Sequence, residues 1–161
     1  MEILIAALVA SLALMHLAYA IQNVLNLTRA GEAVAIVLGQ AEAPVYPRSI
    51  VPPIRSPVLT WIALIAIIAL QFAAGAALAL GSAQMLMAGG GSPADFAAAT
   101  EWALIGCAIA LLIWFGLFLT IGAALFQMWQ TPLGQGAMGD AYRNGMFAGL
   151  VMLIVLFLPT V

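Results

Sequence analysis

The sequence predicts an all-α integral membrane protein, in which residues 1–161 form a single domain built as a four-helix bundle. Two observations lead to this fold class, and the first is composition. Hydrophobic residues make up 66% of the chain and charged residues only 6%, and the mean hydropathy is +1.18. A soluble domain carries about 25% charged residues, so this chain cannot cover a surface that faces water. Most of its surface is therefore expected to face lipid.

The second observation is a set of four apolar runs, each near the roughly 20 residues that a helix needs to cross a bilayer. Each run is predicted to be a helix, because backbone polar groups in hydrocarbon must pair within their own segment. A membrane β-barrel would need alternating apolar and polar residues, and no such alternation is visible. Four crossings predict that both termini lie on the same side of the membrane. The predicted spans are approximately residues 3–25, 58–80, 102–126 and 143–159.

The first connection, residues 27–57, is the longest of the three. Its apolar segment 31–40 is too short to span a bilayer and is predicted to form a short helix lying at the membrane interface. Residues 44–57 contain five prolines, which exclude helix and sheet, so this part is expected to be extended chain packed over the mouth of the bundle. The third connection is glycine-rich and is expected to be a short loop.

His16 is the only histidine and lies inside the first predicted helix. An ionisable residue within the membrane is a candidate functional site. One histidine cannot supply both axial ligands of a bis-histidine haem, but a histidine–methionine haem, for example with Met15, or a single ligand to a chlorophyll-type magnesium stays open. A neutral imidazole bonded to a neighbouring helix is the commoner arrangement. We therefore predict that His16 makes such a bond and that the chain holds no cofactor and no metal.

Amide side chains gather at the ends of the first and third predicted helices. These two helices run in the same direction, so the two groups are expected at the same membrane depth. They could line a small polar pocket or a quinone-headgroup site, or they could hold the first connection across the bundle by hydrogen bonds. We favour the second explanation, because amide bonds between membrane helices are common and contribute roughly 0.6–2 kcal/mol each. The residues are Gln22, Asn23, Asn26, Gln127 and Gln130.

Small residues at a spacing of four suggest faces where helix backbones approach closely. The spacing does not tell whether the neighbouring helix belongs to the same chain or to another subunit. The pair Gly145 and Gly149 in the fourth helix is our candidate for a face that docks a partner. The other predicted packing glycines are Gly75, Gly81 and Gly106.

The predicted spans contain none of the residue sets that an enzyme would need, such as a carboxylate pair, a Ser–His–acid set or a cluster of metal ligands. The net charge of −2 is too small to attract nucleic acid. We predict a non-enzymatic accessory or structural subunit that packs against a larger membrane complex, such as a respiratory or photosynthetic one. Its partners would be the lipid bilayer and other membrane subunits. The alternative is a protein that binds or transports a small ligand, quinone or lipid through the amide pocket.

Five short motifs stand out, and they are Gln22-Asn23, Asn26-Leu27-Thr28, Arg55-Ser56-Pro57, Thr120-Ile121-Gly122 and Met128-Trp129-Gln130-Thr131. They resemble those of a bacterial family of predicted small integral membrane proteins, a four-helix domain. The resemblance covers nearly the whole chain and implies the fold and the bacterial inner membrane, but no activity. Relatives tend to carry an acid where this chain has Ala123-Ala124, and a basic second connection. All four arginines here lie in the first and third connections, which the positive-inside rule places in the cytoplasm, so the orientation stays open.

Overall fold

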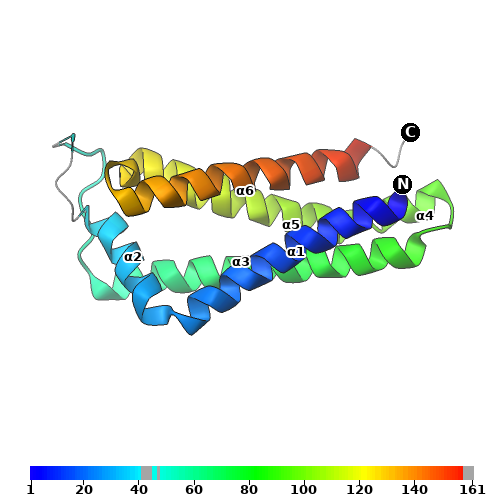
Figure 1. Cartoon of the computed structure of the whole chain (residues 1–161), viewed down its shortest axis with the longest axis horizontal. Helices are drawn as coiled ribbons and strands as arrows, with labels where there is room; N and C mark the ends of the chain where they lie inside the picture. The colour runs from blue at the N-terminus through cyan, green and yellow to red at the C-terminus, as the bar shows by residue number, and fades with distance from the viewer. Residues whose placement is uncertain (41–44, 47, 158–161) are drawn as a thin grey trace.

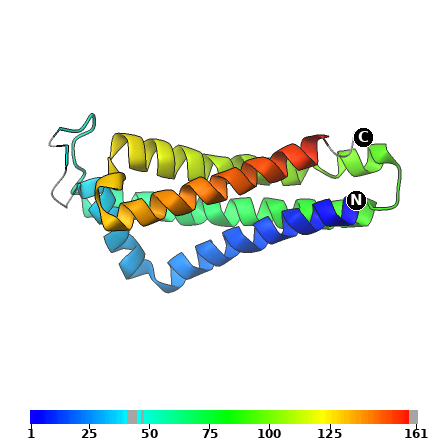
Figure 2. The ribbon, with the colours of Figure 1, turned by 45° about the horizontal axis from the view of Figure 1, so that its top comes forward.

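The computed structural model describes residues 1–40, 45–46 and 48–157 and is helical, with no β-strand among those residues. Four long helical segments lie side by side and form an elongated bundle (Figure 1). The start of the first helix and the last described turn of the final helix lie at the same end of this bundle, and Figure 2 shows the same arrangement after a rotation. All four segments are long and apolar enough to cross a membrane.

The helices follow one another along the chain with short connections, apart from the long connection between α2 and α3. Two of them are not α-helical: η1 is a π-helix and η2 a short 3₁₀-helix. The elements are α1 Glu2–Leu25, α2 Leu27–Gly39, α3 Pro57–Ala88, α4 Pro93–Ala98, α5 Glu101–Leu111, η1 Leu112–Leu125, η2 Met128–Gln130 and α6 Pro132–Phe157.

The prediction for the fourth span is wrong at its beginning. α6 begins at Pro132 rather than near residue 143, so most of the glycine-rich third connection is helical. Glycine at position 134 serves packing here, because a Cβ at Gly134 would overlap the backbone carbonyl of Met128. Proline at the first position of the helix costs no hydrogen bond, since that N–H has no partner within a helix. The predicted residues 158 and 159 lie outside the described part of the chain.

The predicted second and third spans are helices, but both differ in extent or type. α3 continues to Ala88, well past the predicted end at residue 80. The third span consists of α5 followed by η1, in which the hydrogen bonds join residues five apart. The Thr120 hydroxyl follows this wider turn and donates to the carbonyl of Phe115 at 2.9 Å. π-Helical turns are rare and occur frequently at functional sites.

The interior of the bundle is made largely of small side chains. α1 packs along α3, α3 along α5, and α5 with η1 along α6. Alanines fill most positions between them, including Ala6, Ala13, Ala74, Ala103 and Ala110, all at most 3% exposed. Small residues let helix backbones approach closely, and such close packing drives helix association when the lipid and the bundle interior are both apolar.

A short helix was expected over residues 31–40, whereas α2 begins at Leu27, directly after α1, and packs on α3. Its position relative to the membrane surface stays a prediction. α2 ends at Gly39 and is followed by its C-cap residue Gln40, whose backbone is left-handed with φ +47°. Two of the five prolines, Pro44 and Pro47, lie outside the described residues.

Candidate functional site

Five polar or aromatic side chains from all four spans meet inside the bundle, and we call this set the polar layer: His16, Tyr19, Gln71, Trp114 and Asn144. His16 and Gln71 are at most 1% exposed. His16 Nδ1 donates to Gln71 Oε1 at 2.5 Å, which joins α1 to α3. The predicted bond between His16 and a neighbouring helix is therefore present.

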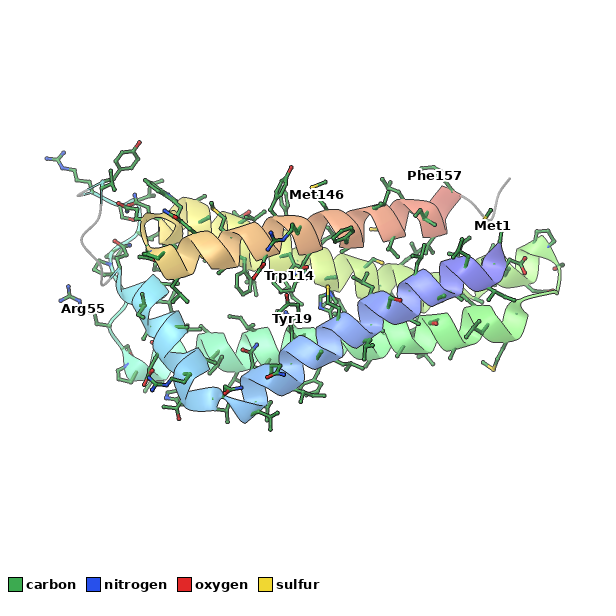
Figure 3. All side chains as sticks on the ribbon, in the orientation of Figure 1. Met1, Tyr19, Arg55, Trp114, Met146 and Phe157 are labelled. Atoms are coloured by element: carbon green, nitrogen blue, oxygen red, sulfur yellow. The ribbon has the colours of Figure 1, made fainter. Side chains whose placement is uncertain are left out.

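The other half of the polar layer joins α1 to α6 and to η1. Asn144 Nδ2 donates to the hydroxyl of Tyr19 at 3.3 Å. The ring of Trp114 lies edge-on to Tyr19 at 5.2 Å and 5.9 Å from the ring of His16, measured between centroids. Tyr19 and Trp114 lie at one level near the middle of the bundle (Figure 3). Each of the four spans thus contributes at least one side chain.

Two buried nitrogens in the polar layer have no hydrogen-bond partner among the described residues, His16 Nε2 and Trp114 Nε1. Because Gln71 accepts from His16 Nδ1, the neutral imidazole carries its proton there, and Nε2 offers a lone pair. The indole N–H can only donate. One acceptor and one donor are the minimum needed to hold a hydroxyl group or a water molecule. His16 Nε2 is also the atom that could ligate a metal or cofactor, although the described residues contain no group of three metal-ligating side chains.

Sequence reasoning identified His16 but missed the other four members of the polar layer. The available signal for Gln71 was its position as the only amide within the apolar run 58–80. Asn144 gave no comparable signal. The fourth span was expected to begin at residue 143, so Asn144 was placed at the end of a helix, where a polar residue is ordinary.

The amides at the end of the third span hold the first connection in place. Gln127 Nε2 donates to the carbonyl of Arg48 at 3.1 Å, and Gln130 Oε1 accepts from the backbone N–H of Tyr46 at 2.8 Å. The two amides also bond to each other at 2.5 Å. The Tyr46 ring packs edge-on against Trp129, with 5.2 Å between centroids. These contacts are the ones expected if the amides hold the first connection across the bundle by hydrogen bonds.

Gln127 has an unfavourable backbone conformation. Its φ of +56° is left-handed, which is uncommon for a residue other than glycine and costs about 1 kcal/mol or more. The two side-chain hydrogen bonds of Gln127 offset this cost. Gln127 is also the N-cap of η2 and directly follows Phe126, the C-cap of η1, so it lies where the chain turns toward α6.

The structure divides the predicted amide cluster into two groups. Gln22 and Asn26 are exposed, and Asn26 Nδ2 donates to the carbonyl of Gln22 at 2.8 Å, within α1. No hydrogen bond joins this group to Gln127 or Gln130 in the described part of the chain. α2 runs from the end of α1 toward the start of α6 (Figure 1), and its 13 residues cover about 20 Å. The separation arises because α2 begins immediately after Asn26.

Three of the predicted packing glycines make contacts within the chain. A Cβ at Gly75 would lie 2.7 Å from the side chain of Leu17, and one at Gly106 would lie 2.5 Å from Leu78 Cγ. A Cβ at Gly81 would overlap the backbone of Ala103. Glycine is therefore required where α3 meets α1 and where α3 meets α5.

Gly145 and Gly149 do not form the exposed docking face that the sequence suggested. Gly145 is buried, and a Cβ there would lie 3.5 Å from Trp114 Cβ. A Cβ at Gly149 would lie 3.8 Å from the side chain of Leu111. Both glycines thus face α5 and η1 of the same chain. The expectation failed because small-residue spacing does not reveal which way a helix is turned.

α6 carries a charged pair on its outer surface. Arg143 donates to Asp140 one turn away, and these side chains are 67% and 50% exposed. Arg143 directly precedes Asn144 of the polar layer. The sequence placed both charges in a loop, whereas the early start of α6 puts them within a spanning helix.

Two hollows flank α2. One, of about 370 Å³, is apolar apart from Asn23 and lies between α2, α3, η1 and α6, where it could accommodate a hydrocarbon chain. The other, of about 700 Å³, lies between α2, the first connection and the start of α3. We call the larger one the end groove, and its polar lining consists of Thr28, Glu32, Gln40, Arg55 and Thr60.

Comparison with known proteins agrees with the helical architecture. The family model described as predicted small integral membrane protein matches residues 1–159. The chain belongs to this family. No curated protein and no solved structure matches the chain. As a member of the family it is an integral membrane protein, and its long apolar helices are the candidate membrane spans.

Two exposed tryptophans mark the depth of the polar layer in this membrane protein. Trp61 precedes Gln71 by ten residues along α3, or about 15 Å. Trp102 precedes Trp114 by twelve residues along the antiparallel α5 and η1, or about 18 Å on the opposite side. Tryptophan is enriched at both membrane interfaces, and the hydrocarbon core is about 30 Å thick. The polar layer therefore lies near the mid-plane, and Asp140 and Arg143 lie within about one helical turn of it.

Proposed function

We propose that the protein is a non-enzymatic accessory or structural subunit of a larger complex in the bacterial inner membrane, such as a respiratory or photosynthetic complex. We further propose that the surface of α6 around Asp140 and Arg143 docks a spanning helix of another subunit, one that carries hydrogen-bonding side chains at the same depth. The observation that carries this proposal is the exposed ion pair beside the polar layer.

The cost of a charge in hydrocarbon supports the docking role. An arginine or aspartate at the centre of a spanning helix costs about 2.5–3.5 kcal/mol by insertion measurements. Pairing the two charges removes part of this cost, but both side chains remain at least half exposed. A partner helix with polar groups would replace the lipid around them. Intramembrane charges accordingly face a protein interior or a water-filled cavity in most membrane proteins.

The alternative function, binding or transport of a small ligand, quinone or lipid at the amide cluster, has weaker support. Its pocket required Gln22 and Asn26 to face Gln127 and Gln130. The latter two use their side chains to hold the first connection, and α2 separates the two groups. The same-side position of the termini is likewise part of our proposal and follows from four crossings.

The proposal is tested by extracting the native protein in mild detergent and identifying the proteins that co-purify with it. Asp140→Asn combined with Arg143→Gln removes the charges while keeping similar shapes. The matched control is Arg29→Gln with Glu32→Gln, because these residues form the same exposed i,i+3 pair on α2. We expect the α6 variant to lose its membrane partner and the α2 variant to retain it.

Two results would contradict the proposal. A wild-type protein that is extracted as a lone monomer would exclude the accessory role. Retention of the partner by the α6 variant would exclude this docking face. If the charges instead face lipid in the native protein, neutralising them should raise the thermal stability of the extracted protein without releasing any partner.

A further inference from the structure

The lining of the end groove includes a glutamate on one wall and an arginine on the other. α2 contributes Thr28, Gly31, Glu32, Ala35 and Gly39 to its lining, spaced by three or four residues so that they share one face of the helix. The first connection and the start of α3 form the opposite wall, which includes Arg55. Small residues on the α2 wall leave the groove open beside Glu32.

Both charged groups can accept a ligand. Arg55 has no ion-pair partner among the described residues. Glu32 pairs with Arg29 at 2.7 Å, and the hydrogen bond from Arg29 to Glu32 raises the pKa of Arg29. Both members are largely exposed, and such surface pairs contribute only about 0–1 kcal/mol. A carboxylate has about four lone-pair sites, so Glu32 can accept a second cation while keeping Arg29.

The end groove lies at the depth of lipid headgroups. Trp61, at its inner edge, is about 15 Å along α3 from Gln71 of the polar layer. Pro57, the first residue of α3, is about 21 Å from Gln71, and Arg55 precedes it by two residues. A bilayer measures about 40–45 Å including its headgroups, so its polar layers lie about 15–22 Å from the mid-plane. Arg55 therefore lies at the outer side of the headgroup region.

We propose that the end groove binds the headgroup of a phospholipid that carries both a phosphodiester and a primary ammonium group, as in phosphatidylethanolamine. Arg55 holds the phosphodiester, since guanidinium donors match the geometry of phosphate oxygens. Glu32 accepts hydrogen bonds from the ammonium group. The volume of about 700 Å³ is within the range of about 300–1,000 Å³ that is common for small-ligand sites.

The charge arrangement predicts selectivity among lipids. A phosphatidylglycerol headgroup offers only hydroxyls to the Glu32 carboxylate and keeps its net negative charge. A phosphatidylcholine headgroup has a quaternary ammonium with no N–H to donate. Both still offer a phosphodiester to Arg55. Phosphatidylethanolamine alone among the three can satisfy both walls of the groove with charge-assisted hydrogen bonds.

The test is native mass spectrometry of detergent-purified, delipidated protein titrated with the three lipids, all with identical acyl chains. We expect wild-type protein to retain phosphatidylethanolamine at least fivefold more than either other lipid. Arg55→Gln should lower retention of all three lipids. Glu32→Gln should remove the preference and leave phosphatidylcholine retention unchanged. Arg48→Gln, another exposed arginine of the first connection but outside the groove, should behave as wild type.

Two outcomes would overturn the proposal: equal retention of the three lipids by wild-type protein, or the same loss of lipid from Arg48→Gln as from Arg55→Gln. All substitutions are at exposed positions, and circular dichroism of each variant checks that its helices are unchanged. The end groove is remote from Asp140 and Arg143, so the result does not depend on the docking proposal.

Discussion

Replacing Gly81 by alanine should destabilise the bundle although alanine is the better helix former. In an open helical position this change stabilises by about 1 kcal/mol. At Gly81 the added methyl would overlap the backbone of Ala103 on α5. Backbone cannot move aside as the end of a flexible side chain can, so the overpacking cost should lie in the upper half of the usual 1–3 kcal/mol. The net result is a loss of about 1–2 kcal/mol in unfolding free energy.

Gly139→Ala is the matched control, because Gly139 lies inside α6 and a Cβ there would have no neighbour within 4 Å. It should stabilise by up to about 1 kcal/mol, so the two variants should differ by about 2–3 kcal/mol. Both are measured by reversible unfolding in mixed detergent micelles, followed by helical circular dichroism. Equal shifts in the same direction for both variants would refute the argument that α3 and α5 approach too closely for a methyl group.

Two further predictions concern hydrogen bonds. Gln71→Leu leaves His16 Nδ1 without its partner and should lower the unfolding free energy by about 0.6–2 kcal/mol in the same assay. Gln84→Leu, at a half-buried position of α3, should lower it less, and equal losses for the two variants would show that the buried His16–Gln71 hydrogen bond does not stabilise the bundle. Gln130→Ala removes the acceptor of the Tyr46 N–H and should speed amide exchange at Tyr46 by hydrogen-exchange mass spectrometry while α1 stays protected; an unchanged rate would mean that other contacts hold the first connection.

The number of spans was predictable because a bilayer imposes a minimum apolar length on any helix that crosses it. The contacts of Gln127 and Gln130 were predictable in kind, because amides at a helix end need partners and the long first connection was the nearest candidate. The start of α6 was not, because glycine, asparagine and aspartate usually indicate a loop. In this chain Gly134 instead permits close contact with Met128, and the segment 132–142 remains helical.

The partners of His16 were unpredictable for a different reason. In a soluble helix, polar residues mark the outer face and thereby fix its rotation. Here lipid and bundle interior are both apolar, so exposed Leu14 and buried Leu12 look the same in the sequence. The rotation of each helix, and with it the distinction between inward Gly145 and outward Arg143, follows from packing against the other helices. Periodicity alone therefore could not assign the docking face.

The polar layer has a consequence for how uniquely the helices are aligned. Surfaces made of alanine and glycine are nearly smooth, so α1 could slide along α3 by a turn and still find close packing. Such a slide would separate the imidazole of His16 from the amide of Gln71, and would leave both buried in hydrocarbon without partners. A single buried polar position is known to select one alignment in coiled coils at some cost in stability. We infer that His16 and Gln71 select one vertical alignment among several that the apolar contacts alone would accept.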